Sequence, residues 1–440
     1  MITDLMELKK IRYSVQMMTG EGEKKSLNVY PAQVRQRFPD KTFVDHIMNF
    51  ICVESAFLEP VEIHIRKLGN EGQSCVVRPL AKQIKAIKRD DEYIVVLSEP
   101  VNLSVEFDGD MYENLFIFSY KPDDNKTQLD DGNVLYFGPG EHEVGLIELK
   151  SNQTLYIDSD AVVYGRVYAK DAANITIKGH GILDGSKENH TDHRPYHVFF
   201  EDCCNIRLEN IIVRDSPAWS IVPMRCQDVF VSGIKQISYN WNSDGFDICS
   251  CDNVEINNVF VRNFDDNISL KSFQVDCKNI TFRDSVVWCD CAHNMLVGPE
   301  ADLENGTIFE NVSFKNITVL ESSEYCETYM GVMAIMCANR AVIKNISWDN
   351  IVVERASISK LINFQYVTEY AKELGHLVDG VSVNNVVSYE KDLPMTILGV
   401  DEEHRIKNVS LKSIVYVDRQ GDSSESLQIN NFVDDITIVP

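Results

Sequence analysis

From about residue 150 the chain repeats one short phrase, an Asn or Asp followed by alternating apolar and polar residues. The period is roughly 23 to 35 residues, which is the range of solenoid folds. Alternation with period two predicts a β-strand with one buried face, and helical periodicity is nearly absent. The pattern therefore disfavours leucine-rich, ankyrin and armadillo solenoids and favours a parallel β-helix. The copies are Asn174–Ile177, Asn205–Leu208, Asp228–Val231, Asn253–Ile256, Asn279–Phe282, Asn311–Phe314, Asn345–Trp348, Gly380–Val383 and Asn408–Leu411.

Residues before about 130 do not follow this period. Glu62–Ile65, Tyr93–Leu97 and Leu103–Phe107 read as antiparallel strands separated by Gly, Asp and Asn turns, which predicts a small β-sandwich. The predicted fold class is therefore all-β, a right-handed parallel β-helix over residues 131–440 preceded by a sandwich domain over residues 1–130. Lys121–Lys126 is expected to be the linker, and the first 50 residues are expected to form a helical or irregular extension.

The charge balance bears on partners. With 42 basic and 67 acidic residues among 440, the net charge is −25, which argues against nucleic acid and anionic membrane as partners. No apolar run approaches the length of a membrane span, and Met1–Lys10 does not resemble a secretory signal. Twelve cysteines then read as reduced thiols, so we expect a cytoplasmic protein unless a leader has been removed.

The chain is rich in Asn-x-Ser/Thr sequences, which would suggest glycosylation of an exported protein. The alternative is that Asn-Ile-Thr and Asn-Val-Ser are turn-then-strand patterns of the repeat, and we favour it. The residues concerned are Asn152, Asn174, Asn267, Asn279, Asn311, Asn316, Asn345 and Asn408.

Two stretches about one coil apart, Asn242–Asp247 and Phe264–Ser272, place carboxylates inside strand-forming sequence. Buried charge is costly unless it is paired or used, so this pattern indicates an active site. Asp244 and Asp265 can stack on neighbouring coils with Asp266 alongside. Inverting glycoside hydrolysis needs one carboxylic acid and one carboxylate about 6.5 to 9.5 Å apart. Repulsion within the cluster would raise the pKa of one member and supply the proton donor.

A turn role is the alternative, since Asp-Gly and Asp-Asn are ordinary turn sequences of a β-solenoid. We favour catalysis for Asp265 and Asp266 together. For Asp247 both interpretations stay open.

The two stretches resemble the motifs Asn-Thr-Asp-Gly-(Phe/Ile)-Asp and Gly-Asp-Asp-Cys-(Ile/Val)-Ala-(Ile/Leu)-Lys-Ser of the polygalacturonase family of glycoside hydrolases. The resemblance covers about residues 132 to 420 and implies the β-helix fold and O-glycosyl hydrolase activity. A β-sandwich followed by Val134–Gly140 also resembles the related dextranase and isopullulanase family. Supporting phrases are Gly179–Gly185, Arg194–Pro195, Ser216–Trp219, Ala292–Asn294 and Val297–Glu300.

Carried over position by position, the resemblance implies that Asp266 is the general acid and that Asp244 and Asp265 hold and activate the water. His293 would tune the acid or touch substrate. Lys271 would bind sugar hydroxyls or, equally, neutralise the cluster.

Further substrate contacts are expected from Asn242, from Asn294, which replaces a family glycine, and from Trp219. Trp219 and Trp241 would stack on sugar faces, with packing between coils as the alternative.

The chain departs from the family where galacturonan-cleaving members carry an Arg-Ile-Lys triplet that binds the substrate carboxylate. The corresponding stretch is taken as Gly331–Ile335, where Met333 and Ile335 replace both cations, with Arg340 and Lys344 nearby. A uronate would lack its bidentate partner there, so we expect a neutral, α-glucan-type substrate, with a pectin-type substrate as the alternative.

Two other function classes stay open. A β-helix polysaccharide lyase or epimerase would use the aspartates to hold calcium, although no Arg stands beside Asp244 or Asp265 as the base. A carbohydrate-binding protein without turnover is the other. The Cys249/Cys251 and Cys289/Cys291 pairs are expected to be interior cysteines, because zinc ligands usually stand further apart. We expect no cofactor or metal and a saccharide as partner, and the oligomeric state is left open.

Overall fold

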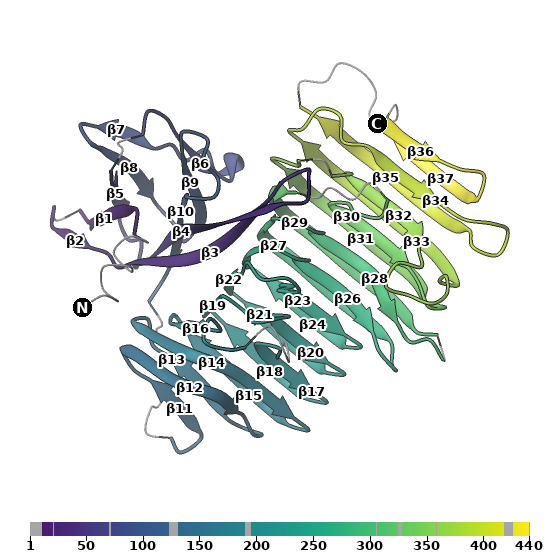
Figure 1. Cartoon of the computed structure of the whole chain (residues 1–440), viewed down its shortest axis with the longest axis horizontal. Helices are drawn as coiled ribbons and strands as arrows, with labels where there is room; N and C mark the ends of the chain where they lie inside the picture. Colours follow the sequence, from purple (N-terminus) through teal and green to yellow (C-terminus); the bar gives the residue numbers. More distant parts are fainter. Residues whose placement is uncertain are drawn as a thin grey trace. The chain divides into compact units, whose positions relative to one another are not determined.

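The computed structural model describes residues 11–20, 22–69, 72–122, 131–189, 195–304, 306–323, 328–357, 359–417 and 426–439. Nearly all of these residues lie in strands or tight connections, as Figure 1 shows. The chain forms two compact units: residues 1–36 with 42–127, and residues 37–41 with 128–440. Most of the predicted linker and Arg194 of the supporting phrases lie outside the described residues.

The first unit contains two five-stranded sheets. Pairs such as β1 with β5 are antiparallel, whereas β10 pairs with β4 in parallel. Its core is aliphatic and aromatic, with Ile51, Ile63, Val95 and Leu103 fully buried. One sheet has the order β2 (Lys24–Ser26), β1 (Tyr13–Met18), β5 (Val61–Lys67), β8 (Glu92–Leu97), β7 (Ile87–Arg89), and the other the order β3 (Val29–Arg37), β4 (Phe43–Glu54), β10 (Leu115–Tyr120), β9 (Asn102–Phe107), β6 (Cys75–Arg78).

The expectation of a helical or irregular extension over the first 50 residues is wrong for the residues that the structure describes there. Residues 11–54 form β1 to β4, which pair within both sheets. The physical reason is visible in β1, where Tyr13 and Val15 alternate with polar residues and bury one face. The first ten residues lie outside the described part of the chain.

The second unit is the parallel β-helix that the repeat predicts, which confirms the fold class. Each strand pairs in parallel with strands of the next coil; Val352 of β31, for example, pairs with Thr318 of β29 and Val387 of β33. The first half consists of β11 (Val134–Phe137), β12 (Gly140–Glu148), β13 (Thr154–Ile157), β14 (Ala161–Lys170), β15 (Ala173–Gly179), β16 (Ile182–Asp184), β17 (Val198–Glu201), β18 (Cys204–Glu209), β19 (Ile212–Arg214), β20 (Ile221–Met224), β21 (Gln227–Ser232), β22 (Lys235–Ile237), β23 (Phe246–Cys249) and β24 (Asp252–Asn257).

The second half includes several strands that are longer than those of the first. Its strands are β25 (Phe260–Asn263), β26 (Ile268–Ser272), β27 (Cys277–Cys289), β28 (Met295–Ala301), β29 (Ile308–Ser322), β30 (Met333–Cys337), β31 (Val342–Val353), β32 (Ile362–Tyr366), β33 (Leu377–Ser388), β34 (Met395–Leu398), β35 (Ile406–Tyr416), β36 (Leu427–Ile429) and β37 (Val433–Val439).

The interior of the β-helix is one continuous apolar column. Aromatic side chains stack along it, with ring centroids of Phe314 and Trp348 5.4 Å apart and those of Trp348 and Phe364 5.2 Å apart. Stacked coils thus bury the apolar face that a single coil would leave exposed.

The leading Asn of the repeat phrase forms an exposed asparagine ladder. Asn279, Asn311 and Asn345 have φ of 56°, 60° and 53°, a left-handed conformation that Asn tolerates better than most residues. Asn311 Nδ2 donates to Asn279 Oδ1 at 3.1 Å, and Asn345 Nδ2 donates to Asn311 Oδ1 at 3.3 Å. The interpretation of these sequences as turn-then-strand patterns therefore agrees with the structure.

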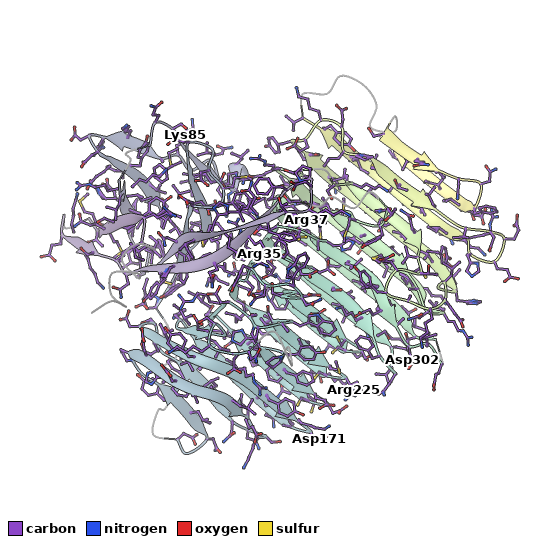
Figure 2. The ribbon with its side chains drawn as sticks, viewed as in Figure 1. Arg35, Arg37, Lys85, Asp171, Arg225 and Asp302 are labelled. Carbon is purple, nitrogen blue, oxygen red and sulfur yellow. The ribbon has the colours of Figure 1, made fainter. Side chains whose placement is uncertain are left out.

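Charged turns line another edge of the β-helix. Figure 2 shows Asp171, Arg225 and Asp302 in the turns that follow β14, β20 and β28. Arg225 bonds to Asp202 at 2.7 Å and to Glu201 at 2.8 Å. Exposed pairs of this kind contribute little stability.

The described residues contain one short 3-10 helix, η1 (Leu80–Lys82), and no helix long and apolar enough to cross a membrane. Their cysteines are free thiols. Cys251 lies in the interior column, as expected, and its Sγ contacts Pro223 O, whereas Cys249 lies outside that column. No zinc-like group of cysteines occurs among the described residues.

Candidate active site

The pairing of β23 with β26 determines where the acidic residues of the site lie. Phe246 pairs with Ile268, and the same offset brings Asp244 level with Asp266 on the next coil. Gly245 between them is required by close approach, since a Cβ there would lie 2.3 Å from Asn267 O. Its N–H donates to Asp266 O at 2.7 Å, so the two coils are fixed at the point where the carboxylates emerge.

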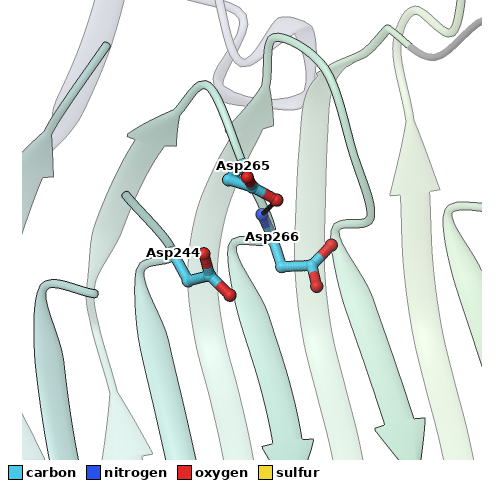
Figure 3. A group of neighbouring side chains, drawn as sticks. All are labelled: Asp244, Asp265 and Asp266. Carbon is cyan, nitrogen blue, oxygen red and sulfur yellow. Dashed lines mark hydrogen bonds between the residues drawn. The ribbon is translucent and has the colours of Figure 1, made fainter. Parts of the chain in front are cut away.

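Asp244, Asp265 and Asp266 form one cluster, which we call the aspartate trio. One carboxylate oxygen from each lies within 4.8 Å of the other two. Figure 3 shows Asp244 and Asp266 on neighbouring coils with Asp265 beside them. The trio lies in a cleft with a water-accessible volume of about 140 Å³. Oxygens this close can hydrogen-bond to a single water.

Asp265 is held by backbone donors. Asn242 N–H donates to its Oδ2 and Asp266 N–H to its Oδ1, each at 3.0 Å. Asp266 is held by His293, whose backbone N–H and ring Nδ1 lie 3.0 and 2.7 Å from Oδ1. The histidine expected beside the trio is therefore in direct contact with one member of it.

Lys271 is the centre of a second group of carboxylates. Its ammonium lies 3.3 Å from Asp244, 2.8 Å from Asp247 and 3.2 Å from Glu300. Of the two roles left open for Lys271, neutralisation of the cluster thus agrees with the contacts. Asp247 takes part in this group and is completely buried, which is more than a turn residue requires.

Burial and neighbouring charges shift the pKa values of the three carboxyls in different directions. Burial raises the pKa of Asp244 well above its usual value, with Asp247 and the rest of the trio adding to the shift against Lys271. Burial and the charge of Asp266 also raise the pKa of Asp265. Burial acts the same way on Asp266, but the charge and hydrogen bonds of His293 outweigh it and lower the pKa of that carboxyl.

Asp247 and Lys271 are linked in the same way. Burial raises the pKa of Asp247 to about 7, although Lys271 opposes this shift. Burial would lower the pKa of Lys271, but Asp247, Asp244 and Glu300 raise it well above its usual value. Lys271 therefore stays charged and shares its charge among three carboxyls.

Trp219 lines the cleft and its ring contacts two other side chains. Its ring stacks on Tyr196 at 4.9 Å with an interplanar angle of 3°, and Lys271 Nζ lies 3.5 Å from its centroid. Trp241 packs edge-on against Phe264 at 4.9 Å and is not among the described residues that line the cleft. For both side chains the contacts favour packing over sugar stacking.

Asn242 lines the cleft, whereas Asn294 does not. Asn294 is completely buried, accepts from Asn267 Nδ2 at 2.8 Å, and donates to Glu321 O at 3.4 Å. It holds successive coils together below the trio, and we leave it out of the proposed substrate contacts.

The assignment of Met333 and Ile335 to the place of the family's cations is wrong. Both side chains point into the apolar interior column. Side chains alternate along β30, so Ala334 and Met336 are the residues on the opposite face, and Met336 lines the cleft. The cations named nearby lie elsewhere: Arg340 pairs with Glu373 at 2.7 Å outside this cleft.

The described lining of the cleft also contains seven residues that are not predicted as site residues from the sequence: Ala292, Leu296, Pro299, Glu300, Met330, Met336 and Tyr370. Glu300 ends one of the supporting phrases, so a signal for it was present. Tyr370 lies in the connection between β32 and β33, where neither strand period nor motif indicates that a side chain reaches the cleft.

The trio is also the one described group of side chains that could hold a metal ion. Carboxylate oxygens suit calcium or magnesium, although both usually recruit more oxygen ligands than three. The same oxygens can hold a water, and Asp244 Oδ1 is buried without a hydrogen-bond partner among the described residues. A buried acceptor of this kind normally has a hydrogen-bond partner.

Comparison with known proteins identifies the family. Residues 145–432 match the model of glycosyl hydrolases family 28, and the chain belongs to this family. A probable polygalacturonase of Arabidopsis thaliana is 26% identical over 237 residues, which cover 50% of each chain. Exopolygalacturonase B of Aspergillus niger is 22% identical over 282 residues, covering 59% of this chain and 62% of the relative. The chain thus spans about half the length of the first of these curated relatives.

Among solved structures, an exopolygalacturonase from Thermotoga maritima is similar with a TM-score of 0.47 and 19% identity, covering 70% of this chain and 84% of that chain.

The expectation of a neutral, α-glucan-type substrate is wrong. The curated relatives are named as polygalacturonases and galacturan galacturonidases, and the family model matches most of the β-helix. That expectation rests on Met333 and Ile335, whose side chains point into the interior of the β-helix. Residues that do not face the cleft carry no information about the charge of the sugar. The resemblance to the dextranase and isopullulanase family stays a prediction.

Proposed function

We propose that this chain hydrolyses α-linked galacturonides of the pectin type. The observation that carries the chemistry is the aspartate trio, three carboxyls on adjacent coils with oxygens within 4.8 Å in one cleft. Family membership and the names of the relatives support the galacturonide as substrate.

We assign the roles within the trio differently from the sequence expectation. Asp266 is kept ionised by His293, so it suits the base that activates water, whereas a general acid needs a raised pKa. Asp265 has a raised pKa and lies next to that base. Asp244 offers an unpartnered oxygen to the same water, with Lys271 balancing its charge.

In the proposed step, Asp265 gives its proton to the glycosidic oxygen as the bond from that oxygen to the anomeric carbon breaks. A water held by Asp244 and Asp266 attacks the anomeric carbon from the opposite face and loses a proton to Asp266. One water is consumed per bond, and the released reducing end has inverted configuration. Inversion is therefore part of the proposal.

The role assignment can be tested with substrates that differ in leaving group. A 4-nitrophenyl α-galacturonide needs little protonation on departure, whereas a digalacturonide needs a proton donor. We expect Asp265→Asn to lose much more activity on the digalacturonide than on the aryl glycoside. Asp266→Asn should lose activity on both alike. An Asp244→Asn variant with the selective pattern, in place of Asp265→Asn, would overturn the assignment.

A lyase mechanism is the second candidate, favoured only by the ability of the trio to hold a cation. Among the described residues that line the cleft, Lys271 and His293 are the basic side chains, and both are bonded to carboxylates. Full activity after treatment with a chelator, with saturated products, would support hydrolysis. Loss of activity restored by calcium would support the lyase.

We also propose a cytoplasmic location, supported by the free thiols of the described cysteines. Fractionation of cells would test it.

A further inference from the structure

One side of the cleft is apolar. Leu296, Ala334 and Met336 form a buried cluster separate from the interior column, with Tyr329 packed against it. Leu296 of β28 pairs with Ala334 of β30, so the cluster continues along the coils beyond the one that carries Asp266. Leu296, Met336 and Met330 line the cleft together with the trio, and we call these three residues the methionine wall.

The rim beside the methionine wall carries an exposed aromatic side chain. Tyr370 lines the cleft, is 67% exposed, and has a φ of 58°, a left-handed conformation that is rare for a bulky residue. Its hydroxyl lies 3.3 Å from that of Tyr329. Strained backbone at a ligand cleft is typical of a side chain held in place for contact, and a tyrosine ring suits the apolar face of a sugar.

The charge of the cleft excludes a simple site for a free carboxylate on this side. Among the described residues, the lining includes Asp244, Asp265, Asp266 and Glu300, whereas its one lysine, Lys271, is bonded to three carboxylates. A uronate carboxylate placed over Met330 and Met336 would lose hydration without gaining a cation from the described lining. This placement is unfavourable, whereas a methyl group packs well against thioethers.

Resting on the proposed function, we propose that the sugar unit bound over the methionine wall is a galacturonosyl unit whose carboxyl is methyl-esterified. The backbone remains a galacturonan, and the claim concerns this one subsite. The ester methyl contacts Met330 and Met336, and the ring lies against Tyr370. The ester itself is not cleaved; it removes a charge for which the described lining of the cleft offers no uncommitted cation.

The test compares two trigalacturonides that differ only in methyl esterification. We expect kcat/KM to be at least about tenfold higher for the esterified substrate, as a difference of one unpaired charge predicts. Preference for the free acid would overturn the inference while leaving the proposed function intact. Hydrolysis of neither substrate would instead contradict the proposed function.

A positively charged substitution in the methionine wall provides a second test of the inference. Met330 is partly exposed, so Met330→Lys is compatible with folding and should shift the preference toward the free acid by about tenfold or more. Val275→Lys adds the same charge at a half-exposed position outside the cleft and should leave the preference unchanged. If Met330→Lys does not shift the preference in the folded variant, this subsite does not bind the C6 group and the inference is wrong.

Discussion

The asparagine ladder and the aspartate trio both stack polar side chains on successive coils, yet they differ in cost. An amide both donates and accepts, so Asn311 bonds to Asn279 and Asn345 along an exposed edge. Ionised carboxylates only accept, so stacking them in a buried cleft raises the pKa of Asp244 and Asp265. The same stacking on successive coils therefore stabilises the fold when the side chains are amides, and shifts pKa values as catalysis requires when they are carboxyls.

The largest effect, on turnover, should come from replacing a carboxyl of the aspartate trio with an amide like those of the asparagine ladder. Asp266→Asn keeps the shape of the side chain but removes the base, so we expect turnover of oligogalacturonides to fall by about 10² to 10⁴-fold. The variant should fold normally, because one repelling charge is gone. Product release followed by chromatography, with the melting temperature as the control for folding, measures both. Activity close to wild type in the folded variant would remove Asp266 from the mechanism.

The second effect concerns stability and pH. Burial raises the pKa of Asp247 to about 7 in the folded chain, so the folded state binds more protons than the unfolded state between about pH 4 and 7. The free energy of unfolding should therefore fall as the pH rises through this window. The contribution of Asp247 is up to about 4 kcal/mol, shared with its neighbours.

Denaturant titrations of wild type and Asp247→Asn at pH 4, 5.5 and 7 measure this contribution. The variant should lose less stability than wild type as the pH rises. Parallel pH profiles for the two proteins would mean that Asp247 is ionised in the folded chain throughout the window.

The smallest effect should come from making the ladder resemble the trio. Asn311→Asp keeps an acceptor but removes the donor to Asn279, so we expect a loss of about 1 kcal/mol of stability. Turnover should be unchanged, because this edge does not line the cleft. Thermal unfolding and a standard assay measure the two quantities. A large loss of activity would show that the two edges are coupled.

The fold and the centre of the site could be predicted from the sequence because both are periodic. The alternating phrase fixes strands and coil length, and the spacing of Asp244 from Asp265 and Asp266 then brings them to one place. Lys271 and His293 are predicted from the family resemblance, and the structure places both in contact with members of the trio.

The remaining features depend on which face of a strand a side chain occupies and on the loops between strands. Periodicity alone determines neither. A shift of one residue exchanges the two faces of a strand, so the sequence alignment predicts a cleft position for Met333, whereas the structure places Met333 in the interior and Met336 in the cleft. Tyr370 comes from a connection whose length varies freely. The protonation state of Asp266 depends on the orientation of the His293 ring, which the spacing of residues in the sequence does not determine.

The central claim is that the trio directs a water onto the anomeric carbon of a galacturonide. Proton NMR of the first product formed from an α-linked oligogalacturonide tests it most directly. We predict a saturated product whose new reducing end is first the β-anomer, before mutarotation. An α-anomer formed first, or an unsaturated product, would contradict the account.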